Sequence, residues 1–570
     1  MTVRTLHAGG HDFEVTGEGY SPTGEIRLAG QPPNDQQRPA LLELAAVLVG
    51  GNRSRIAQEA GTWKLTGDPT EGALLVAGIK AGADLARIEQ EWPQVAELPF
   101  DSERKRSSIV RRLPEGRLRI FCNGAPGDLL KQCNRLHTPE GIRPITDEDR
   151  KRILDQASKL AGQALRVLAS ATADRDDLPP DALTAESVER DLVFVGLAGM
   201  YDPPRPEARD AITRCRDAGI RVVMITGDHP QTAAAIAREL GIAGDEPATT
   251  GAELDTLSDA DLHRRAAATP VYARVTAEHK LRIVRALKSD GSVVAMTGDG
   301  VNDAPALQGA DIGIALGRSG TEVTKQAADM VITDDNFATI VAAVEEGRGT
   351  YDNIRKTLQY LLAGNTGELL LMTVCVLAGM PTPLLPIHLL WINLLTDGLP
   401  ALCLVTDPVD PDVMLRKPRP RSSRIANNPF LRMMFLTGFL TAGVAFATYA
   451  WVLRAGSPAE ARAAAFAVMV YAELLRSFGV RSATLPVWRI PLHTNLSLVI
   501  VVAASFALQI FSQQNATVIR LLKTAPVPFL DGLVYLAIGT IPLLLLEGIK
   551  LLRNANPSNP GPTTAVIGAS

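Results

Sequence analysis

The pattern of hydrophobic positions changes near residue 350 and divides the chain into two kinds of sequence. Before that point, short apolar runs alternate with charged segments; after it, long apolar runs dominate. A helix needs about 20 apolar residues to cross a bilayer. Residues 346–553 are therefore predicted to form a stalk and six transmembrane helices, at about 357–380, 384–405, 431–453, 461–478, 495–511 and 529–549. The tail, 554–570, is rich in Pro, Ser, Thr and Gly and is predicted to be disordered.

Residues 200–345 alternate short β-type runs with turns and helical segments. Val222–Ile225 precedes one glycine-containing turn, and Val293–Met296 precedes another. This repeat predicts a doubly wound parallel α/β sheet, in which ligands gather at the carboxyl ends of the strands. Residues 1–199 also mix strands with helices, and we interpret them as a separate α+β domain.

Composition and charge narrow the range of partners. The net charge is −4 and aromatic residues make up 5% of the chain, so nothing indicates nucleic-acid binding. The five cysteines have no Cys-x-x-Cys spacing, which argues against a disulfide framework or a zinc site. Lys and Arg concentrate after the second and fourth predicted spans, so the positive-inside rule places the α/β part and the C-terminus in the cytoplasm. We expect a multi-pass protein embedded in the lipid of the cell membrane.

Two turns at strand ends carry groups suited to phosphate chemistry. Thr226-Gly227-Asp228 follows one strand, and the heptapeptide 297–303 follows the other. A hydroxyl and backbone N–H groups at such a turn can bind a phosphate. Asp299, with Asp303 close behind it, can hold Mg²⁺.

Positive charge for a transferred phosphoryl group is expected from Arg274 and Lys280. The alternative is that each turn only caps the helix after it, a role in which Asp and Thr are common. For one such turn the two interpretations are about equally good. Two turns, together with the segment Val301–Pro305, make the capping alternative weak.

Six polar residues interrupt three of the predicted spans. Carboxylates are costly inside a bilayer, so they indicate an ion path. Three carboxylates with amide and hydroxyl oxygens suit a hard cation such as Ca²⁺. Gly398 and Pro400 can loosen the second span and free backbone carbonyls. The alternative is hydrogen bonding between helices, which suits an asparagine better than an aspartate. The six residues are Asn365, Glu368, Asn393, Thr396, Asp397 and Glu473.

Four motifs of residues 200–345 resemble the phosphorylation domain of P-type ATPases, which belongs to the haloacid dehalogenase superfamily. They are Asp202–Arg205, Thr226–Asp228, Met296–Pro305 and Ala310–Gly313. The resemblance implies a Rossmann-like fold, with ATP as substrate, Mg²⁺ as cofactor and Asp299 as the Mg²⁺ ligand. The catalytic residues it implies are Thr226, Gly227, Asp228, Arg274, Lys280, Asn302 and Asp303.

The region 1–199 resembles the nucleotide-binding domain of the same family. The matching segments are Gly67–Leu74, Pro99–Lys105 and Leu165–Ala169. The nucleotide-binding residues implied are Glu71, Phe100, Lys105 and Arg166. An aromatic face with Lys and Arg suits adenine and phosphate, although Phe100 taken alone would more often belong to a core. The sequence departs from the family at Asn123, where a lysine is usual, and at Gly127, where a glutamate is usual.

The membrane residues resemble those of type II pumps of the calcium-pump kind. The printed sequence lacks the Asp-Lys-Thr-Gly-Thr motif whose aspartate the family phosphorylates, the actuator domain and the first four helices. We therefore expect the parallel sheet to lack its first strand. One hypothesis is that the chain is the C-terminal part of a cation pump, active when another chain supplies the rest. The alternative is a non-catalytic membrane protein that retains nucleotide or Mg²⁺ binding; a soluble-type phosphatase is weaker, because it also needs the aspartate.

Overall fold

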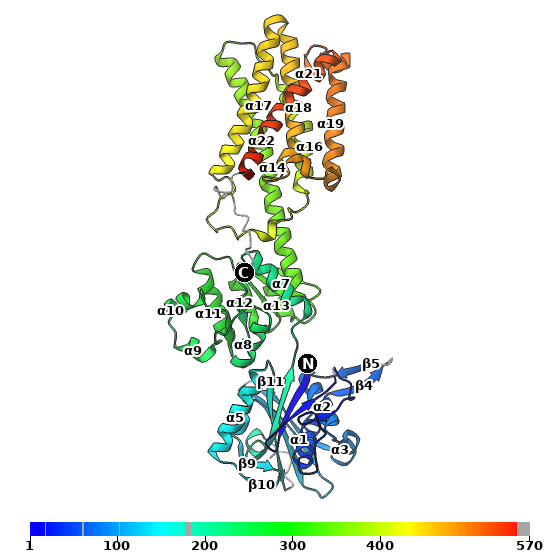
Figure 1. The fold of residues 1–570 in the computed structure, drawn as a ribbon, viewed down its shortest axis with the longest axis vertical. Helices are drawn as coiled ribbons and strands as arrows, with labels where there is room; N and C mark the ends of the chain where they lie inside the picture. The colour runs from blue at the N-terminus through cyan, green and yellow to red at the C-terminus, as the bar shows by residue number, and fades with distance from the viewer. Residues whose placement is uncertain (18, 60–61, 102, 177–183, 556–570) are drawn as a thin grey trace. The chain divides into compact units, whose positions relative to one another are not determined.

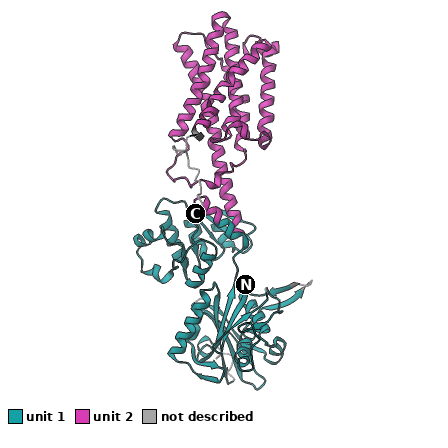
Figure 2. Cartoon of the chain, viewed as in Figure 1, with its two compact units in different colours: residues 1–212, 222–335 teal, residues 213–221, 336–570 magenta. Residues whose placement is uncertain are grey.

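The computed structural model describes residues 1–17, 19–59, 62–101, 103–176 and 184–555. These residues form two compact units (Figure 2). The first comprises residues 1–212 and 222–335, and the second comprises 213–221 and the residues from 336 onward. The predicted disordered tail lies, apart from its first two residues, outside the described part of the chain.

The N-terminal region of the first unit is built on a ten-stranded, mainly antiparallel sheet. Its main path runs β3-β2-β1-β12-β11-β8-β7-β6, and β9 joins it through a parallel pairing with β12. The ten strands are β1 (Thr2–Ala8), β2 (His11–Val15), β3 (Ile26–Arg27), β6 (Gln94–Asp101), β7 (Arg106–Arg112), β8 (Leu118–Gly124), β9 (Cys133–Thr138), β10 (Gly141–Pro144), β11 (Arg166–Arg175) and β12 (Leu192–Tyr201). A separate hairpin pairs β4 (Arg55–Glu59) with β5 (Thr62–Thr66).

Helices cover both faces of this sheet, and each face has its own apolar core. On one face α1 (Arg38–Gly50) and α2 (Pro69–Lys80) pack Leu44 and Leu74 into a cluster with the strands. On the other face α5 (Asp147–Ala161) contributes Ile153. Figure 1 shows α5 on the opposite side of the sheet from α1 and α2. The shorter helices are α3 (Leu85–Glu91), α4 (Pro126–Leu130) and α6 (Ala185–Val188).

The rest of the first unit has two three-stranded parallel sheets instead of one continuous sheet. Their orders are β13-β15-β14 and β16-β17-β18. The strands are β13 (Met224–Ile225), β14 (Thr249–Thr250), β15 (Val271–Ala273), β16 (Ala295–Gly298), β17 (Ile312–Leu316) and β18 (Met330–Ile332). Within the described residues, β13 pairs only with β15 and β16 only with β17. The predicted parallel α/β region is thus present, with a break where the first strand was expected to be missing.

Helices follow the strands of this region in the order expected for a doubly wound fold. They are α7 (Pro206–Asp217), α8 (Pro230–Glu239), α9 (Gly251–Thr256), α10 (Asp259–Ala266), α11 (Ala277–Lys288), the 3₁₀ turn η2 (Val301–Asp303), α12 (Ala304–Gly309) and α13 (Glu322–Ala327). Ile225 of β13 packs in two apolar clusters, one with Tyr272 of β15 and one with Met296 of β16. The two sheets therefore share apolar packing although no strand hydrogen bonds join them.

Within the described part of the second unit, six helical spans are long and apolar enough to cross a membrane, as predicted. The first span and the stalk form one continuous helix, α14, because no proline or cap interrupts it. The elements are α14 (Phe337–Leu377), α15 (Pro386–Trp391), η3 (Ile392–Gly398), α16 (Leu399–Val405), η4 (Val413–Leu415), α17 (Asn428–Ala455), α18 (Pro458–Val480), η5 (Val487–Arg489), η6 (Leu492–Asn495), α19 (Leu496–Gln514), α20 (Ala516–Leu522), α21 (Phe529–Gly539) and α22 (Ile541–Ala555).

The second span departs from regular α-helix in its middle. Residues Ile392–Gly398 form a π-helical segment, followed by Pro400 in the first turn of α16. Proline has no N–H to donate and crowds the preceding turn, so the backbone before it must rearrange. Such π segments are frequent at functional sites. Asp397 and Thr396 lie within this one and are buried.

Candidate functional site

The turn after β13 is organised by its own side chains. Thr226 Oγ1 donates to Asp228 Oδ2 over 3.0 Å and accepts the Asp228 N–H over 3.1 Å. Gly227 is exposed, and a Cβ added there would meet no atom within 4 Å. Arg274 has a left-handed backbone, with φ of +53°, and its N–H donates to Asp228 O over 3.2 Å. The strand end that carries Asp228 is therefore held from β15.

The turn after β16 is organised around a buried carboxylate. Asp303 Oδ2 accepts the N–H groups of Asp299 and Gly300 over 3.3 and 3.1 Å. Its other oxygen, Oδ1, accepts a hydrogen bond from Lys280 Nζ of α11 over 2.5 Å. A Cβ on Gly298 would lie 2.4 Å from Asp303 Cβ, so only glycine lets the carboxylate fold under the turn. Asp303 therefore binds the turn and Lys280 together.

Asp299 is left free to bind a ligand. It is exposed, and among the described residues its carboxylate has no recorded partner, whereas its backbone carbonyl accepts Thr324 Oγ1 over 3.1 Å. A fixed backbone with a free carboxylate fits a Mg²⁺ ligand. Asn302 is exposed in the same turn.

The segment from Arg274 to Lys280 joins the two turns, since Arg274 binds the first and Lys280 the second. Burial, followed by the positive charge of Arg274, lowers the pKa of the imidazole of His229, next to Asp228. The structure thus brings together the residues predicted for phosphate chemistry. Their roles in catalysis remain predictions.

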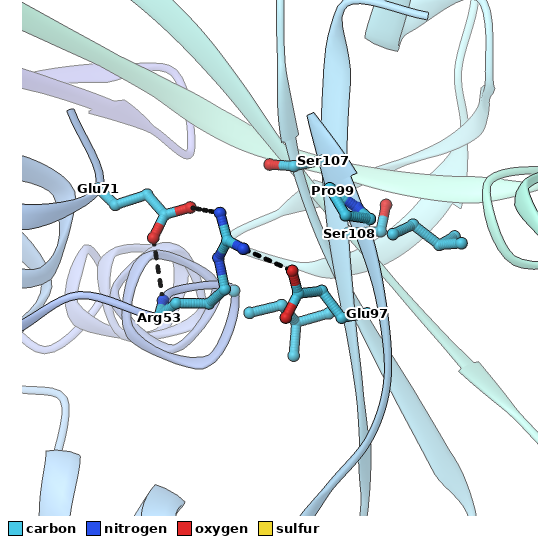
Figure 3. A pocket seen from close by; sticks show the side chains of 9 residues that line it. Arg53, Glu71, Glu97, Pro99, Ser107 and Ser108 are labelled. Carbon is cyan, nitrogen blue, oxygen red and sulfur yellow. Dashed lines mark hydrogen bonds and ion pairs between the residues drawn. The ribbon is translucent and has the colours of Figure 1, made fainter. Parts of the chain in front are cut away.

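The predicted nucleotide residues are only partly gathered. Asp68 caps α2 by accepting the N–H groups of Thr70 and Glu71, which places Glu71 in the first helical turn. Glu71 borders a small pocket whose lining residues are Gly51, Arg53, Glu71, Glu97, Leu98, Pro99, Ser107, Ser108 and Ile109 (Figure 3). Phe100, Lys105 and Arg166 do not line it.

The other three nucleotide residues remain outside any core. The side chain of Phe100 is 66% exposed, which removes the alternative that it belongs to a core. Arg166 is exposed as well. Lys105 lies 3.6 Å from Asp128 and has a left-handed backbone. An exposed aromatic ring is suited to stacking on a flat ligand.

Inside the second unit, three carboxylates from three helical spans meet. Ligand oxygens of Glu368, Asp397 and Glu473 all lie within 4.8 Å of one another, and all three residues are buried. Among the residues that the structure describes, both oxygens of Asp397, both of Glu473 and Oε1 of Glu368 have no hydrogen-bond partner of good geometry. Buried carboxylates without partners are costly. Their spacing and donor type fit one bound hard cation, which would satisfy them.

Two of the six predicted membrane residues, both amides, are exposed where the cluster is buried, although the Asn393 side chain contacts Glu368. Asn365 and Asn393 are exposed on their helices, and Asn393 Nδ2 donates to Leu389 O of its own helix over 2.8 Å. Thr396 is buried, and its carbonyl accepts the Tyr360 hydroxyl over 2.7 Å. The buried part of the cluster therefore consists of the three carboxylates.

Comparisons with known proteins agree across nearly the whole chain. Residues 381–552 match the family model "Cation transporting ATPase, C-terminus", and residues 40–207 match "P-type ATPase, cytoplasmic domain N". Residues 128–311 and 279–344 match two models of haloacid dehalogenase-like hydrolases. The chain belongs to the P-type cation-transporting ATPases. It corresponds to their C-terminal portion.

Individual relatives support this assignment to the P-type ATPases. A "Calcium-transporting ATPase" of Bacillus subtilis is 39% identical over 558 residues, which cover 97% of this chain and 62% of that protein. "Calcium-transporting ATPase 1" of Bacillus cereus is 41% identical over 505 residues, or 86% and 56% of the two chains. "Cation-transporting ATPase pma1" of Synechocystis is 37% identical over 579 residues, or 97% and 62%. The chain thus spans about three fifths of the length of these relatives.

Two arginines at these P-type ATPase sites were missed by the sequence analysis. Arg53 enters the pocket of Figure 3, where its guanidinium binds Glu97 over 2.6 Å and Glu71 over 3.5 Å. Nothing in the sequence around Arg53 signals this, because Glu97 is distant along the chain. Arg476 is buried beside the carboxylate cluster. Its position three residues after Glu473 in an apolar span was a usable signal, since charges in membrane spans are rarely without function.

The residue that replaces the usual lysine has a structural role here. Asn123 is buried. Its Oδ1 accepts a hydrogen bond from Ser170 Oγ over 2.7 Å, and its Nδ2 donates one to Gly51 O over 3.4 Å. The side chain therefore fixes β8 against β11 and the end of α1. The pocket of Figure 3, which Asn123 does not line, contains the guanidinium of Arg53 instead.

Proposed function

We propose that the chain forms the nucleotide-binding, phosphoryl-transfer and cation-conducting parts of an ATP-driven cation pump, with Ca²⁺ as the transported ion. The observation that carries this proposal is the group of three buried carboxylates in the membrane unit, with ligand oxygens within 4.8 Å of one another. A soluble phosphatase has no use for such a group. Calcium suits it because carboxylate oxygens in a flexible cage are typical calcium ligands. Two of the relatives described above are named calcium-transporting ATPases.

The phosphoryl-transfer part rests on the two linked turns. Thr226 and the turn at Gly227 bind the transferred phosphoryl group, and Lys280 places positive charge beside it. Asp299 holds Mg²⁺, which supplies charge neutralisation for the phosphoryl oxygens when bound. ATP is the phosphoryl donor. Glu71 and the exposed ring of Phe100 contribute to its binding.

The phosphorylated aspartate is supplied by a segment outside the printed sequence. A strand that enters between β13 and β16 would join the two three-stranded sheets. Its carboxyl end would then lie beside Asp228 and Asp299, where the active sites of such sheets form. This segment belongs to a separate chain or to a longer form of the same protein. We place the complete pump in the cell membrane, with the α/β regions and the C-terminus in the cytoplasm.

The test is ATP-dependent ⁴⁵Ca²⁺ uptake into inverted membrane vesicles. The chain is produced together with a polypeptide that carries the actuator domain, four helices and the Asp-Lys-Thr-Gly-Thr segment of the family. We expect uptake that is lost in Asp397→Asn and in Asp299→Asn, but retained in Arg53→Lys. If the two polypeptides copurify and uptake is absent, the non-catalytic alternative is the better account.

A further inference from the structure

Arg476 carries a charge of the same sign as a transported cation and lies beside the membrane cluster. It lies on α18, one helical turn after Glu473, and is among the largest fully buried side chains of the described residues. Residues at i and i+3 share a helix face, so the guanidinium and the Glu473 carboxylate point to the same side. A charge that deep in a bilayer is retained only with compensation nearby.

The surroundings hold the guanidinium without neutralising it. Its Nη2 donates to Tyr360 O over 3.1 Å, and its central carbon lies 4.8 Å from the centre of the Tyr360 ring. Nε and Nη1 have no hydrogen-bond partner among the described residues. The contact with the ring face is a favourable cation–π arrangement. Tyr360 thus positions the guanidinium while leaving most of its donors open.

The Nη2 end of the guanidinium borders the same space as the carboxylates. A Cβ added to Gly364 would lie 2.9 Å from Glu473 Oε1, 3.1 Å from Asp397 Oδ2 and 3.2 Å from Arg476 Nη2. Those three atoms therefore surround one point next to the α14 backbone. The described residues show no direct ion pair between Arg476 and either carboxylate, so the groups border a common space instead of closing it.

We propose that Arg476 is a fixed internal counter-charge that limits this site to a single divalent cation. Three carboxylates and one guanidinium sum to −2, which one divalent cation neutralises. A second divalent cation would leave two uncompensated positive charges in a medium of low permittivity, where such an excess is strongly disfavoured. Arg476 is thus a stoichiometry-determining residue, and this inference rests on the proposed function of the cluster as a cation site.

The experiment measures ⁴⁵Ca²⁺ bound at equilibrium per purified 570-residue chain in lipid nanodiscs. We expect one ion per parent chain and one per Arg476→Lys chain. In Arg476→Met the first ion should bind about 10-fold more tightly or better, because a repulsive charge a few ångströms away is gone, and a second ion should bind. Arg481→Met is the matched control: Arg481 is buried on the same helix end but binds Asp407 over 2.9 Å, and its loss should leave the stoichiometry at one.

Melting temperatures show whether the Arg476→Met variant is folded. In Arg476→Met the three carboxylates lose their counter-charge, so we expect a lower melting temperature than in the parent. The charge-balanced double variant Glu473→Gln/Arg476→Met should regain most of the lost melting temperature. Two ions on the parent, or a folded Arg476→Met with parental affinity and stoichiometry, would overturn the role of Arg476 and leave the cation site standing. Absence of binding in every variant would instead overturn the proposed cation site, and this inference with it.

Discussion

Among single residues, Asp149 shows how one carboxylate can fix the start of a helix. It closes a capping box with Thr146 at the beginning of α5 and binds Arg143 through both oxygens, over 2.6 and 2.9 Å. The hydrogen bonds from Arg143, followed by those from Thr146, hold the pKa of the Asp149 carboxyl well below its usual range. The folded chain therefore binds fewer protons at this site than the unfolded chain does.

That difference predicts a pH-dependent effect of Asp149→Asn. A carboxyl with a depressed pKa in the folded state stabilises the fold fully above its unfolded pKa, near 4, and loses this contribution as pH falls through the folded value. We expect Asp149→Asn to lower the stability of the N-terminal region by about 1 kcal/mol at pH 7, a typical cost for a weakened cap. The deficit should shrink steadily below pH 4. Urea unfolding followed by circular dichroism at pH 7, 4 and 3 measures it, and a deficit independent of pH would contradict the assignment.

Gly364 gives a second prediction at this scale. Alanine normally stabilises a helix relative to glycine by up to about 1 kcal/mol. At Gly364, however, the added Cβ would contact Glu473, Asp397 and Arg476 at 3.2 Å or less. We expect Gly364→Ala to weaken ⁴⁵Ca²⁺ binding about 10-fold or more while the chain stays folded, since each 1.4 kcal/mol of lost interaction is tenfold in affinity. Gly443→Ala on α17, where a Cβ meets no atom within 4 Å, is the control and should bind normally.

Residue identity could be predicted from the sequence more readily than residue orientation. Asp397 and Glu473 are conspicuous because carboxylates are rare in apolar runs, and both are buried in the cluster. Asn365 shares a predicted helix face with Glu368, yet it is exposed. Spacing along a helix defines a face only to within a broad arc, and the packing of neighbouring helices decides where the buried arc ends. Arg53 could not be predicted, because its contact with Glu97 depends on tertiary structure.

At the scale of elements, strands β13 and β16 are edge strands of two separate parallel sheets that share apolar packing. Each carries one of the two turns proposed to bind phosphate, and each is joined by strand hydrogen bonds on one side only within the described residues. Their partners β15 and β17 are central strands, bonded on both sides and largely buried. An unpaired strand edge is open to solvent and to strand addition.

Hydrogen exchange should distinguish these strands. We expect the amides of β13 and β16 that face away from their sheets to exchange at least 10-fold faster than those of β15 and β17, because bonded amides exchange only on local opening. When the polypeptide with the Asp-Lys-Thr-Gly-Thr segment binds, protection should rise at β13 and β16 and stay unchanged at β18. Equal protection of edge and central strands in the chain alone would contradict the broken sheet.

The elements themselves were predictable where a local signal exists. The strand–turn–helix repeats of 200–345 and the six apolar spans are both present. For Ile392–Gly398 the sequence predicted only a loosened helix at Gly398 and Pro400, not the π-helical form. Proline indicates that a helix is disturbed, but it does not determine how the backbone carbonyls rearrange. The continuity of α14 through stalk and membrane was also hidden, since hydropathy detects the apolar part of a helix and not its polar extension.

For the whole molecule, the chain holds two kinds of site in two compact units: the linked turns at Asp228 and Asp299 in one, and the carboxylate cluster in the other. Neither site contains the Asp-Lys-Thr-Gly-Thr aspartate that the family phosphorylates. The linked turns hold Thr226, Lys280 and a free Asp299 carboxylate, which we propose position and neutralise a phosphoryl group. Cation binding and phosphoryl transfer should therefore be separable in this chain.

This separation leads to the prediction that the 570-residue chain alone binds ⁴⁵Ca²⁺ but forms no acid-stable, hydroxylamine-sensitive phosphoenzyme from [γ-³²P]ATP. The acyl phosphate of the family forms on an aspartate that the printed sequence does not contain, and positioning without a nucleophile cannot create that bond. Adding the polypeptide that carries this aspartate should produce labelling on that polypeptide, and Asp299→Asn in the present chain should reduce it about 100-fold or more, as expected when charge stabilisation of a transition state is removed. Acid gels with and without hydroxylamine measure the product. Labelling of the chain by itself would mean that one of its own carboxylates, with Asp228 and Asp299 the first to replace by asparagine, acts as the nucleophile.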